Sequence, residues 1–246
     1  MNKIKILKAN IDLIDHRSVL DSILNLLRNK NYGYICVANV HMCMEVFDDN
    51  HYAEIINKAE MAVPDGRPLV WAQKLLGYNN AHQVRGSDLT LNICKEAEKK
   101  NIPIGLYGGS DKAIDGFQNF LKNRYPNLKV AYALSPPFRK LSQNEDANVI
   151  NDINDSGARI LFVGLGCPKQ EFWMAEHKGK INCIMIGIGA AFDFFGGTKK
   201  QAPIIMQQTG TEWLSRLASE PRRLWKRYLK HNPRFVYYFL KQLFTQ

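Results

Sequence analysis

The feature that most constrains the fold is an alternation of short apolar runs with longer amphipathic runs. The strand-like runs are Lys3–Leu7, Tyr34–Ala38, Met61–Val63, Ile104–Tyr107, Lys129–Leu134, Ile160–Gly164 and Cys183–Ile188. Between them, apolar residues recur at helical spacing in Ser18–Arg28, Leu69–Leu76, Leu89–Lys99, Ala113–Asn123, Asn148–Asn154 and Glu171–His177. Several strands are apolar throughout, which is typical of parallel strands covered on both faces. The pattern therefore predicts a doubly wound α/β domain with a mostly parallel sheet and helices on both faces.

The strand pattern stops after Gly197, and the rest of the chain has the spacing of short helices. These are predicted at Pro203–Gln208, Glu212–Leu217, Pro221–Lys230 and Phe235–Phe244. Proline suits the first turn of a helix, whereas Asn232-Pro233 is expected to separate the last two helices. We therefore predict an α/β catalytic domain over residues 1–198 and a helical appendage over residues 199–246.

Positive charge is concentrated in the predicted appendage. The chain carries a net charge of +10, and residues 199–246 contribute ten Lys or Arg against Glu212 and Glu220. An anionic partner is expected: nucleic acid, phospholipid headgroups or a phosphorylated substrate. A basic helix at 221–230 followed by an aromatic, weakly charged one at 235–244 is typical of a membrane-surface element. The alternative is a helical hairpin packed on the body with its charged face in water.

Other features narrow the class of protein. The longest uncharged apolar stretch, Cys183–Phe192, is too short for a spanning helix. The N-terminus has no apolar core of a secretion signal. Five cysteines without a C-x-x-C pair indicate reduced, buried thiols in a cytosolic protein.

Polar residues follow two of the predicted strands. Asn39 comes after Tyr34–Ala38, where its amide could orient a substrate hydroxyl or could simply cap the next helix. Asp65 lies in a Pro-Asp-Gly turn after Met61–Val63. There a carboxylate can act as a general base, or it can only shape the turn. Both residues are candidates because ligands of such sheets bind at the carboxyl ends of the strands.

Arg85 and three glycine-rich loops add candidates for binding phosphate. Arg85 precedes a helix that Ser87 or Asp88 is expected to cap, and its guanidinium can bind a phosphate or carboxylate. Glycine-rich loops follow three strands, at Gly105–Ser110, Gly164–Glu171 and Gly187–Asp193. Glycines let a phosphate approach the backbone at a helix N-terminus, so the loops together favour a nucleotide or nucleotide-sugar ligand.

Several motifs are absent from the sequence. There is no G-x-x-x-x-G-K-[ST] motif of a P-loop and no D-x-D pair to hold a divalent metal on a diphosphate. The six histidines show no ligand spacing, so no zinc site and no metal cofactor are expected. A departing diphosphate would then be neutralised by arginines and helix N-termini.

These segments, in this order, resemble the WecG/TagA/CpsF family of bacterial glycosyltransferases. The matching stretches are Ala38–His41, Pro64–Gly66, Val84–Asp88, Gly105–Gly109, Val163–Glu171, Gly189–Phe194, Ala202-Pro203, Glu212–Leu217 and Glu220–Arg223. The resemblance implies a Rossmann-like α/β body with a helical C-terminal appendage. It also implies transfer of a sugar from a UDP-sugar to a polyprenyl-diphosphate-linked sugar, with inversion and without a metal, at the inner face of the membrane.

The resemblance assigns roles to individual residues. It makes Asp65 the catalytic base, and it places three residues at the sugar site, namely Asn39, Arg85 and Gln170. Arg216, Arg223 and Arg227 match appendage arginines expected to bind the lipid diphosphate. Gly108, Gly109 and Asp193 fall at the same sheet edge and are expected to bind substrate. One departure is Val37-Ala38, where some members have a threonine before the asparagine, and this affects the donor preference.

The family's substrates define the expected function. The donor would carry N-acetylmannosamine, its uronic acid or a related hexose, and the acceptor would be GlcNAc-diphosphate-undecaprenol. The product would enter a cell-surface polysaccharide: a teichoic acid linkage unit, a capsule, an O-antigen or a common antigen. We expect no cofactor, a peripheral position on anionic membrane at the cytoplasmic side, and association into homo-oligomers.

Two other classes of protein are less consistent with the sequence. A nucleic-acid-binding protein with a basic arm is disfavoured because the aromatic residues of the appendage do not alternate with its basic residues. No nucleic-acid partner is therefore expected. An NAD-dependent oxidoreductase is disfavoured because no complete G-x-G-x-x-G occurs near the N-terminus.

Overall fold

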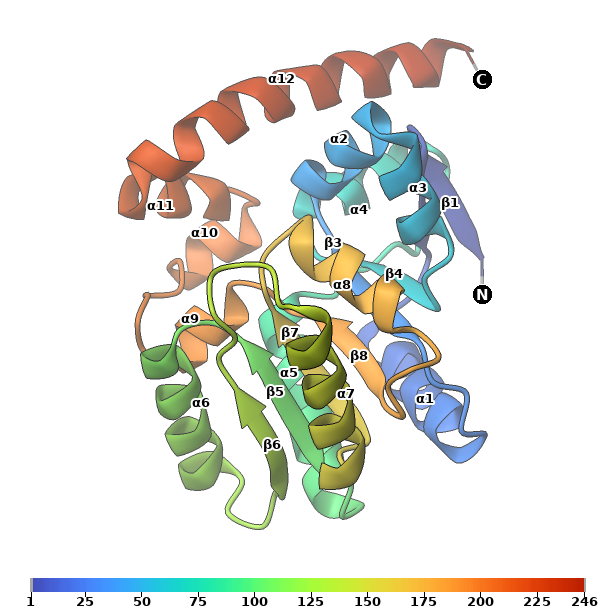
Figure 1. The fold of residues 1–246 in the computed structure, drawn as a ribbon. Helices are drawn as coiled ribbons and strands as arrows, with labels where there is room; N and C mark the ends of the chain where they lie inside the picture. The colour runs from blue at the N-terminus through green and yellow to red at the C-terminus, as the bar shows by residue number, and fades with distance from the viewer. Residues whose placement is uncertain (1, 246) are drawn as a thin grey trace. The chain divides into compact units, whose positions relative to one another are not determined.

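The computed structural model describes residues 2–245 and divides the chain into two compact units. Unit 1 consists of Met1–Asp15, Val37–Arg85 and Gln201–Gln246, and unit 2 consists of His16–Cys36 and Gly86–Lys200. Figure 1 labels the helices and strands along the chain. The predicted boundary after residue 198 separates a catalytic domain from a helical appendage by their expected roles. This division stays a prediction.

The main sheet confirms the predicted fold class. Its strands are β3 (Tyr34–Ala38), β4 (Met61–Pro64), β5 (Ile104–Gly108), β6 (Val130–Leu134), β7 (Ile160–Gly164) and β8 (Ile184–Gly187). They lie in the order β4-β3-β8-β7-β5-β6. Parallel pairings join β3 to β8, β8 to β7, β7 to β5 and β5 to β6. Every residue of β3, β4, β5 and β8 is buried, which explains their uniformly apolar sequences.

Unit 2 supplies helices to both faces of its strands. Its helices are α1 (His16–Arg28), α5 (Gly86–Lys99), α6 (Asp111–Arg124), α7 (Gln143–Ser156), α8 (Lys169–His177) and α9 (Ala191–Phe195). In Figure 1 α7 and α8 lie in front of the strands and α5 lies behind them. The five longer helices were predicted, although α7 begins earlier, at a capping box between Ser142 and Glu145. Since α5 begins at Gly86, Ser87 and Asp88 lie in its first turn, and the expectation that one of them caps it was wrong.

Unit 1 contains a small antiparallel sheet of two strands, of which the sequence pattern predicted only the first. Strand β1 (Lys3–Ile6) pairs with β2 (Ala9–Asp12) rather than joining the main sheet. The prediction omitted β2 because its sequence, Ala-Asn-Ile-Asp, holds three residues that are depleted in strands. It also omitted α2 (Val40–Asp48) and α3 (Asn50–Asn57), which flank Asp49. Helix α4 (Arg67–Leu75) was expected.

The last two predicted helices are one helix, α12 (Pro221–Thr245), so the predicted break at Pro233 was wrong. Proline cannot donate to the carbonyl of Leu229 and costs a helix interior about 3 kcal/mol. The helix continues because it packs against α2 on both sides of the proline, through His231 before it and Tyr238 after it. Phe235 and Phe239, after the proline, are also buried, and each contributes about 1.5–3 kcal/mol by leaving water. Figure 1 shows α12 as one long, curved helix.

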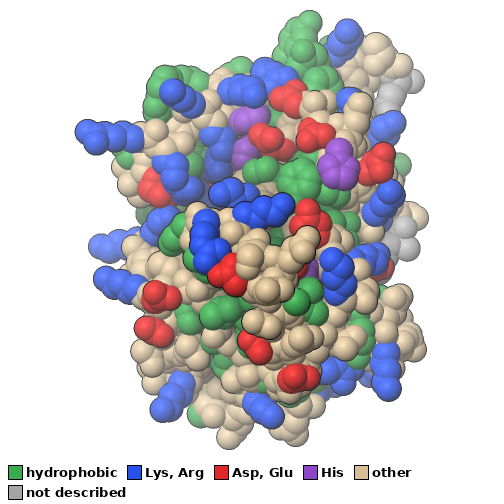
Figure 2. Space-filling model, viewed as in Figure 1, with side chains coloured by type: hydrophobic (Ala, Val, Ile, Leu, Met, Phe, Trp, Pro, Cys, Tyr) green, Lys and Arg blue, Asp and Glu red, His purple; other side chains and the backbone are tan. Residues whose placement is uncertain are grey.

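Helices α10 (Ile204–Gln208) and α11 (Glu212–Ser219) precede α12 and were predicted. Exposed hydrophobic side chains occur on all three helices: Ile204, Ile205, Leu214, Trp225, Leu229, Val236, Tyr237, Leu240 and Phe244. Figure 2 shows Lys and Arg side chains (blue) beside hydrophobic ones (green) along the upper edge, where α12 runs in Figure 1. Between residues 2 and 245, no helix is both long and apolar enough to span a bilayer.

The five cysteines are free, as expected, and all but Cys167 are buried. Burial raises the pKa of Cys43 to about 12 and that of Cys183 to about 12. Their thiols therefore stay protonated and unreactive near neutral pH.

Candidate functional site

A cavity of about 440 Å³ lies in unit 1. Asn39 and Asp65 line it from the ends of β3 and β4. Arg216 of α11 and Arg227 of α12 also line it. The fold thus brings together four of the residues that the sequence singled out, from segments far apart in the chain. A carboxylate, an amide and two guanidinium groups around one cavity can bind a polar, anionic substrate and accept a proton from it.

Backbone hydrogen bonds fix the strand ends at this cavity. The N–H groups of Asp65 and Gly66 both donate to the carbonyl of Ala38, at 2.9 and 3.2 Å. A Cβ atom on Gly66 would lie 3.4 Å from Asn39 Cα, so the two turns are in close contact. The Asn39 side chain accepts a hydrogen bond from the N–H of Met42 at 3.2 Å and caps α2. The capping role weighed for Asn39 is thus confirmed, and its side chain lies at the cavity as well.

Asp65 has a half-buried side chain at the start of α4. Its carbonyl oxygen accepts a hydrogen bond of 2.5 Å from Gln83 Nε2, which ties the turn to the segment before Arg85. Gly66 occupies the N-cap position of α4 without a side-chain cap. The first N–H groups of this helix therefore begin beside Asp65, where the helix dipole favours negative charge.

Arg85 and Arg216 share an acidic partner on α11. Arg85 Nη1 donates to Gln207 Oε1 at 2.6 Å, and its Nη2 lies 3.5 Å from Glu212 Oε2. Arg216 Nη2 donates to the other oxygen of Glu212 at 3.1 Å. Gln207, Glu212 and Arg216 line the cavity, whereas Arg85 is not part of its lining. Arg85 therefore holds α10 and α11 in place from outside the lining.

The other two appendage arginines differ from each other. The Nε atom of Arg227 is buried without a hydrogen-bond partner in the described chain, and its guanidinium lies 5.1 Å from the ring centre of Tyr228. Arg223 is outside the cavity lining, and its side chain is 60 % exposed. It binds Glu220 through two hydrogen bonds, of 2.9 and 2.5 Å. Arg227 can therefore donate a hydrogen bond to a ligand in the cavity, whereas Arg223 does not line the cavity.

The remaining predicted residues belong to unit 2. Gly108 ends β5 and Gly109 follows it, with φ angles of 125° and 72°, which residues with a side chain rarely adopt. The N–H of Gly109 donates to the carbonyl of Gly164 at 3.0 Å, so this loop packs against the end of β7. Ser110 then caps α6. The loop has the strand, glycine and helix order expected of a phosphate-binding turn.

Gln170 and Asp193 lie near the ends of β7 and β8. Gln170 is buried, and its Nε2 donates to Glu171 Oε1 at 2.7 Å, while its Oε1 has no hydrogen-bond partner in the described chain. Asp193 accepts hydrogen bonds from Thr198 at 3.0 Å and from Lys199 at 2.7 Å. Asp193 thus stabilises its own loop, whereas the Gln170 amide keeps an unused acceptor.

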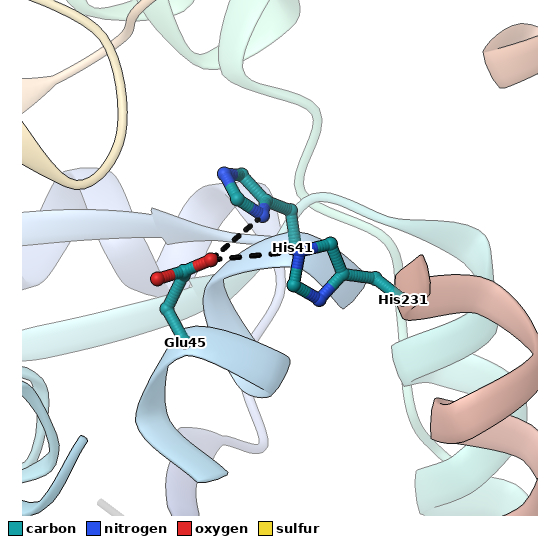
Figure 3. Close-up of side chains that lie close together, drawn as sticks. All are labelled: His41, Glu45 and His231. Carbon is teal, nitrogen blue, oxygen red and sulfur yellow. Dashed lines mark ion pairs between the residues drawn. The ribbon is translucent and has the colours of Figure 1, made fainter. Parts of the chain in front are cut away.

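The structure also brings together two histidines that sequence reasoning missed. His41, Glu45 and His231 place one donor atom each within 4.8 Å of one another, as Figure 3 shows. The expectation that the histidines form no cluster was therefore wrong. His41 and Glu45 are four residues apart on α2, which was the available signal, but His231 comes from α12. Burial, with Lys230 and Arg234 nearby, lowers the pKa of His231.

Comparison with known proteins agrees with the resemblance seen in the motifs. The profile of the glycosyl transferase WecG/TagA/CpsF family matches residues 4–246. Proteins of Staphylococcus aureus strains MW2 and NCTC 8325 are each 29 % identical to this chain over 242 residues, which cover 97 % of it and 92 % of the relative. Both are named N-acetylglucosaminyldiphosphoundecaprenol N-acetyl-beta-D-mannosaminyltransferase. Because the match spans residues 4–246, the chain belongs to the WecG/TagA/CpsF family and is a glycosyltransferase.

Proposed function

We propose that this enzyme transfers a sugar from a UDP-sugar to GlcNAc-diphosphate-undecaprenol, with inversion and without a metal in the transfer step. The observation that carries the proposal is the cavity of unit 1. Asp65 and Asn39 line it together with Arg216 and Arg227. The names of the S. aureus relatives support this acceptor and N-acetylmannosamine as the transferred sugar. The product would enter a cell-surface polysaccharide.

Asp65 is the proposed general base. Its carboxylate takes the proton from an acceptor hydroxyl as that oxygen attacks the anomeric carbon of the donor. The bond between the anomeric carbon and the UDP oxygen breaks on the opposite face, and UDP leaves with the electron pair. A single attack of this kind inverts the anomeric centre. A positioned base contributes about 10²–10⁴-fold to such a step. Asn39 is proposed to orient the attacking hydroxyl through its amide.

Positive groups are proposed to neutralise the two diphosphates. Arg216 and Arg227 suit the lipid diphosphate of the acceptor, because both line the cavity and guanidinium groups bind phosphate through two donors. Arg223 is proposed to contribute less to binding of this diphosphate, because its guanidinium is already bound to Glu220. The loop at Gly108 and Gly109 in unit 2 is proposed for the donor phosphates, with Gln170 at the sugar.

Release of UDP tests this function. The protein is mixed with a panel of UDP-sugars and a short-chain polyprenyl-diphosphate-GlcNAc, with a chelator present. We expect acceptor-dependent release from UDP-N-acetylmannosamine or a related donor, and loss of at least about 100-fold in Asp65→Asn. Asp115→Asn, an exposed carboxylate in unit 2, is the control and should keep full activity. Release that needs an added divalent metal, or that survives in Asp65→Asn, would overturn the mechanism.

Residues 199–246 are proposed to hold the enzyme on the inner face of the cell membrane, with residues 1–198 as the catalytic body. Exposed Trp225 and Leu229 alternate on α12 with exposed basic residues, namely Arg222, Lys226 and Lys230. Such a surface inserts its apolar side chains at the headgroup level while the basic ones attract anionic lipid, at about 1 kcal/mol per well-placed charge. We propose no nucleic-acid partner, and we propose association into homo-oligomers, as the resemblance implies.

Sedimentation with vesicles tests the membrane proposal. Binding to phosphatidylglycerol vesicles should exceed binding to phosphatidylcholine vesicles and should fall in a triple variant, Arg222→Gln with Lys226→Gln and Lys230→Gln. The matched control neutralises three exposed lysines in or directly after α5: Lys95→Gln, Lys99→Gln and Lys100→Gln. Equal loss in the two triple variants would refute a local membrane surface, because both remove the same net charge.

A further inference from the structure

We propose that His41, Glu45 and His231 bind one divalent transition-metal ion of the Zn²⁺ class. The inference rests on the positions of these three side chains, all in unit 1, and does not depend on the proposed sugar transfer. It assigns the ion a place between α2 and α12, and no step of the transfer passes through it.

The spacing of the donor atoms fits a coordination shell. Glu45 Oε1 lies 3.5 Å from His41 Nδ1 and 3.5 Å from His231 Nε2. Ligand atoms about 2.0–2.2 Å from a tetrahedral ion are about 3.3–3.6 Å apart along each edge. The two edges to Glu45 match this value, and the two histidine nitrogens lie within 4.8 Å of each other. Both nitrogens face the same oxygen of Glu45, Oε1, and the two rings are tilted by 58° with centres 4.9 Å apart (Figure 3).

A simple network of ion pairs explains the same contacts less well. Charged hydrogen bonds between nitrogen and carboxylate have lengths of about 2.7–2.9 Å, shorter than both distances to Glu45. His231 has a side chain only 5 % exposed, and its Nδ1 is buried without a hydrogen-bond partner in the described chain. A metal bond through Nε2 would replace its long contact with Glu45, whereas Nδ1 would keep its proton and stay without a partner.

Neighbouring contacts hold the ligands in position before an ion binds. One turn along the same two helices, Arg234 of α12 donates two hydrogen bonds to Asp48 of α2, at 2.9 and 2.6 Å. The rings of Phe47 and Tyr238 are also in contact across α2 and α12, with centres 4.5 Å apart. The two helices therefore keep their register independently of the three ligands, and little rearrangement is needed for binding.

The donor set indicates the class of ion. Two imidazoles and one carboxylate suit Zn²⁺, Co²⁺ and related ions, whereas Mg²⁺ and Ca²⁺ prefer shells of oxygen alone. Three protein ligands leave a coordination position for a water molecule or an anionic ligand. His41 and His231 line the cavity, so this position is available from it. The expected structural effect is to fasten α12 to α2.

Titration of the full chain with Co²⁺ and Zn²⁺, after treatment with a chelator, tests the site. We expect one Co²⁺ per chain, with visible absorption typical of four or five ligands and without the charge-transfer band of a thiolate ligand. The absent thiolate band distinguishes this site from binding to a cysteine. Zn²⁺ should displace Co²⁺ and raise the melting temperature by several degrees, and the chelator should reverse that rise.

Variants locate the ion. Glu45→Gln and His231→Gln should each weaken Co²⁺ binding by more than about 100-fold, because even residues that only support a metal ligand contribute 10–100-fold. His82→Gln, an exposed histidine of unit 1, is the matched control and should bind as the wild type does. A wild-type chain that binds no Co²⁺, a thiolate spectrum, or binding that persists in both ligand variants would each overturn the proposal. If a ligand variant does not fold, the visible spectrum of the wild-type chain with Co²⁺ still tests whether the site exists.

Discussion

The N–H of Asp65 donates a hydrogen bond of 2.9 Å to the carbonyl of Ala38, so the proposed base is fixed to the end of the neighbouring strand. Ala38 is followed directly by Asn39, and both polar side chains therefore begin from one rigid corner of the fold. Such a corner keeps a carboxylate and an amide in a constant relation without a flexible loop between them. The proposed positions of base and substrate hydroxyl depend on this corner.

Asn39 is expected to have two separable roles. Asn39→Ser should keep the cap of α2, because a serine oxygen can accept the hydrogen bond from Met42. Stability should then change by less than about 0.5 kcal/mol, whereas the loss of the amide should lower transfer by about tenfold or more. Asn39→Ala is the comparison, since it should lose the amide and also about 1 kcal/mol of stability. Urea unfolding and UDP release measure the two effects. Full activity in Asn39→Ser would show that Asn39 caps α2 and has no role in transfer.

Arg227 and Arg223 form a matched pair of the same residue type on one helix. Arg227→Gln should raise the KM for the lipid acceptor by about tenfold or more, because it lines the cavity and a charged hydrogen bond is worth about 1.5–3 kcal/mol. Arg223→Gln should raise it less than threefold, since an exposed pair with Glu220 contributes about 0–1 kcal/mol. Steady-state kinetics with a short-chain acceptor compares them. Equal changes in KM would contradict the assignment of the diphosphate to the cavity.

The sequence predicted the main sheet because its strands are buried on both faces, so their apolar runs are unambiguous. It predicted Asn39 and Asp65 as site candidates for a related reason: the residue after a parallel strand lies at the ligand-binding edge. Local signals were therefore sufficient wherever one segment determines its own structure.

The errors arose where distant segments decide the outcome. Pro233 predicts a break locally, yet packing against α2 and the burial of Phe235 and Phe239 keep the helix continuous. His231 lies far along the chain from His41, and only the packing of α12 on α2 places their rings 4.9 Å apart. No spacing rule within one segment can reveal such a pair.

Gly108 should not tolerate a side chain. In Gly108→Ala the new Cβ would lie 2.6 Å from the carbonyl carbon of Gly164, and the φ angle of 125° is unfavourable as well. We expect a loss of about 3 kcal/mol or more, from strain and overpacking together. Gly157→Ala is the control, because its φ is 75° but no atom lies within 4 Å of its Cβ. It should lose only about 1–2 kcal/mol. Similar losses in urea unfolding would mean that the contact with Gly164 relaxes freely.

The ion pair between Asp48 and Arg234 should make the attachment of α12 to α2 dependent on pH. The hydrogen bonds from Arg234 lower the pKa of Asp48 below its ordinary value of 3.8. A carboxylate with a lowered pKa stabilises the folded state fully above its unfolded pKa, and this stabilisation is lost as the pH falls through the folded pKa. A double-mutant cycle with Asp48→Asn and Arg234→Gln should therefore give a coupling energy of up to about 1 kcal/mol near neutral pH, the usual size for a solvent-accessible pair. The coupling should decrease toward zero in acid, as the pH falls through the lowered pKa of Asp48. Urea unfolding of the four proteins at both pH values measures it, and a coupling energy that stays constant with pH would show that Asp48 acts through packing rather than through its charge.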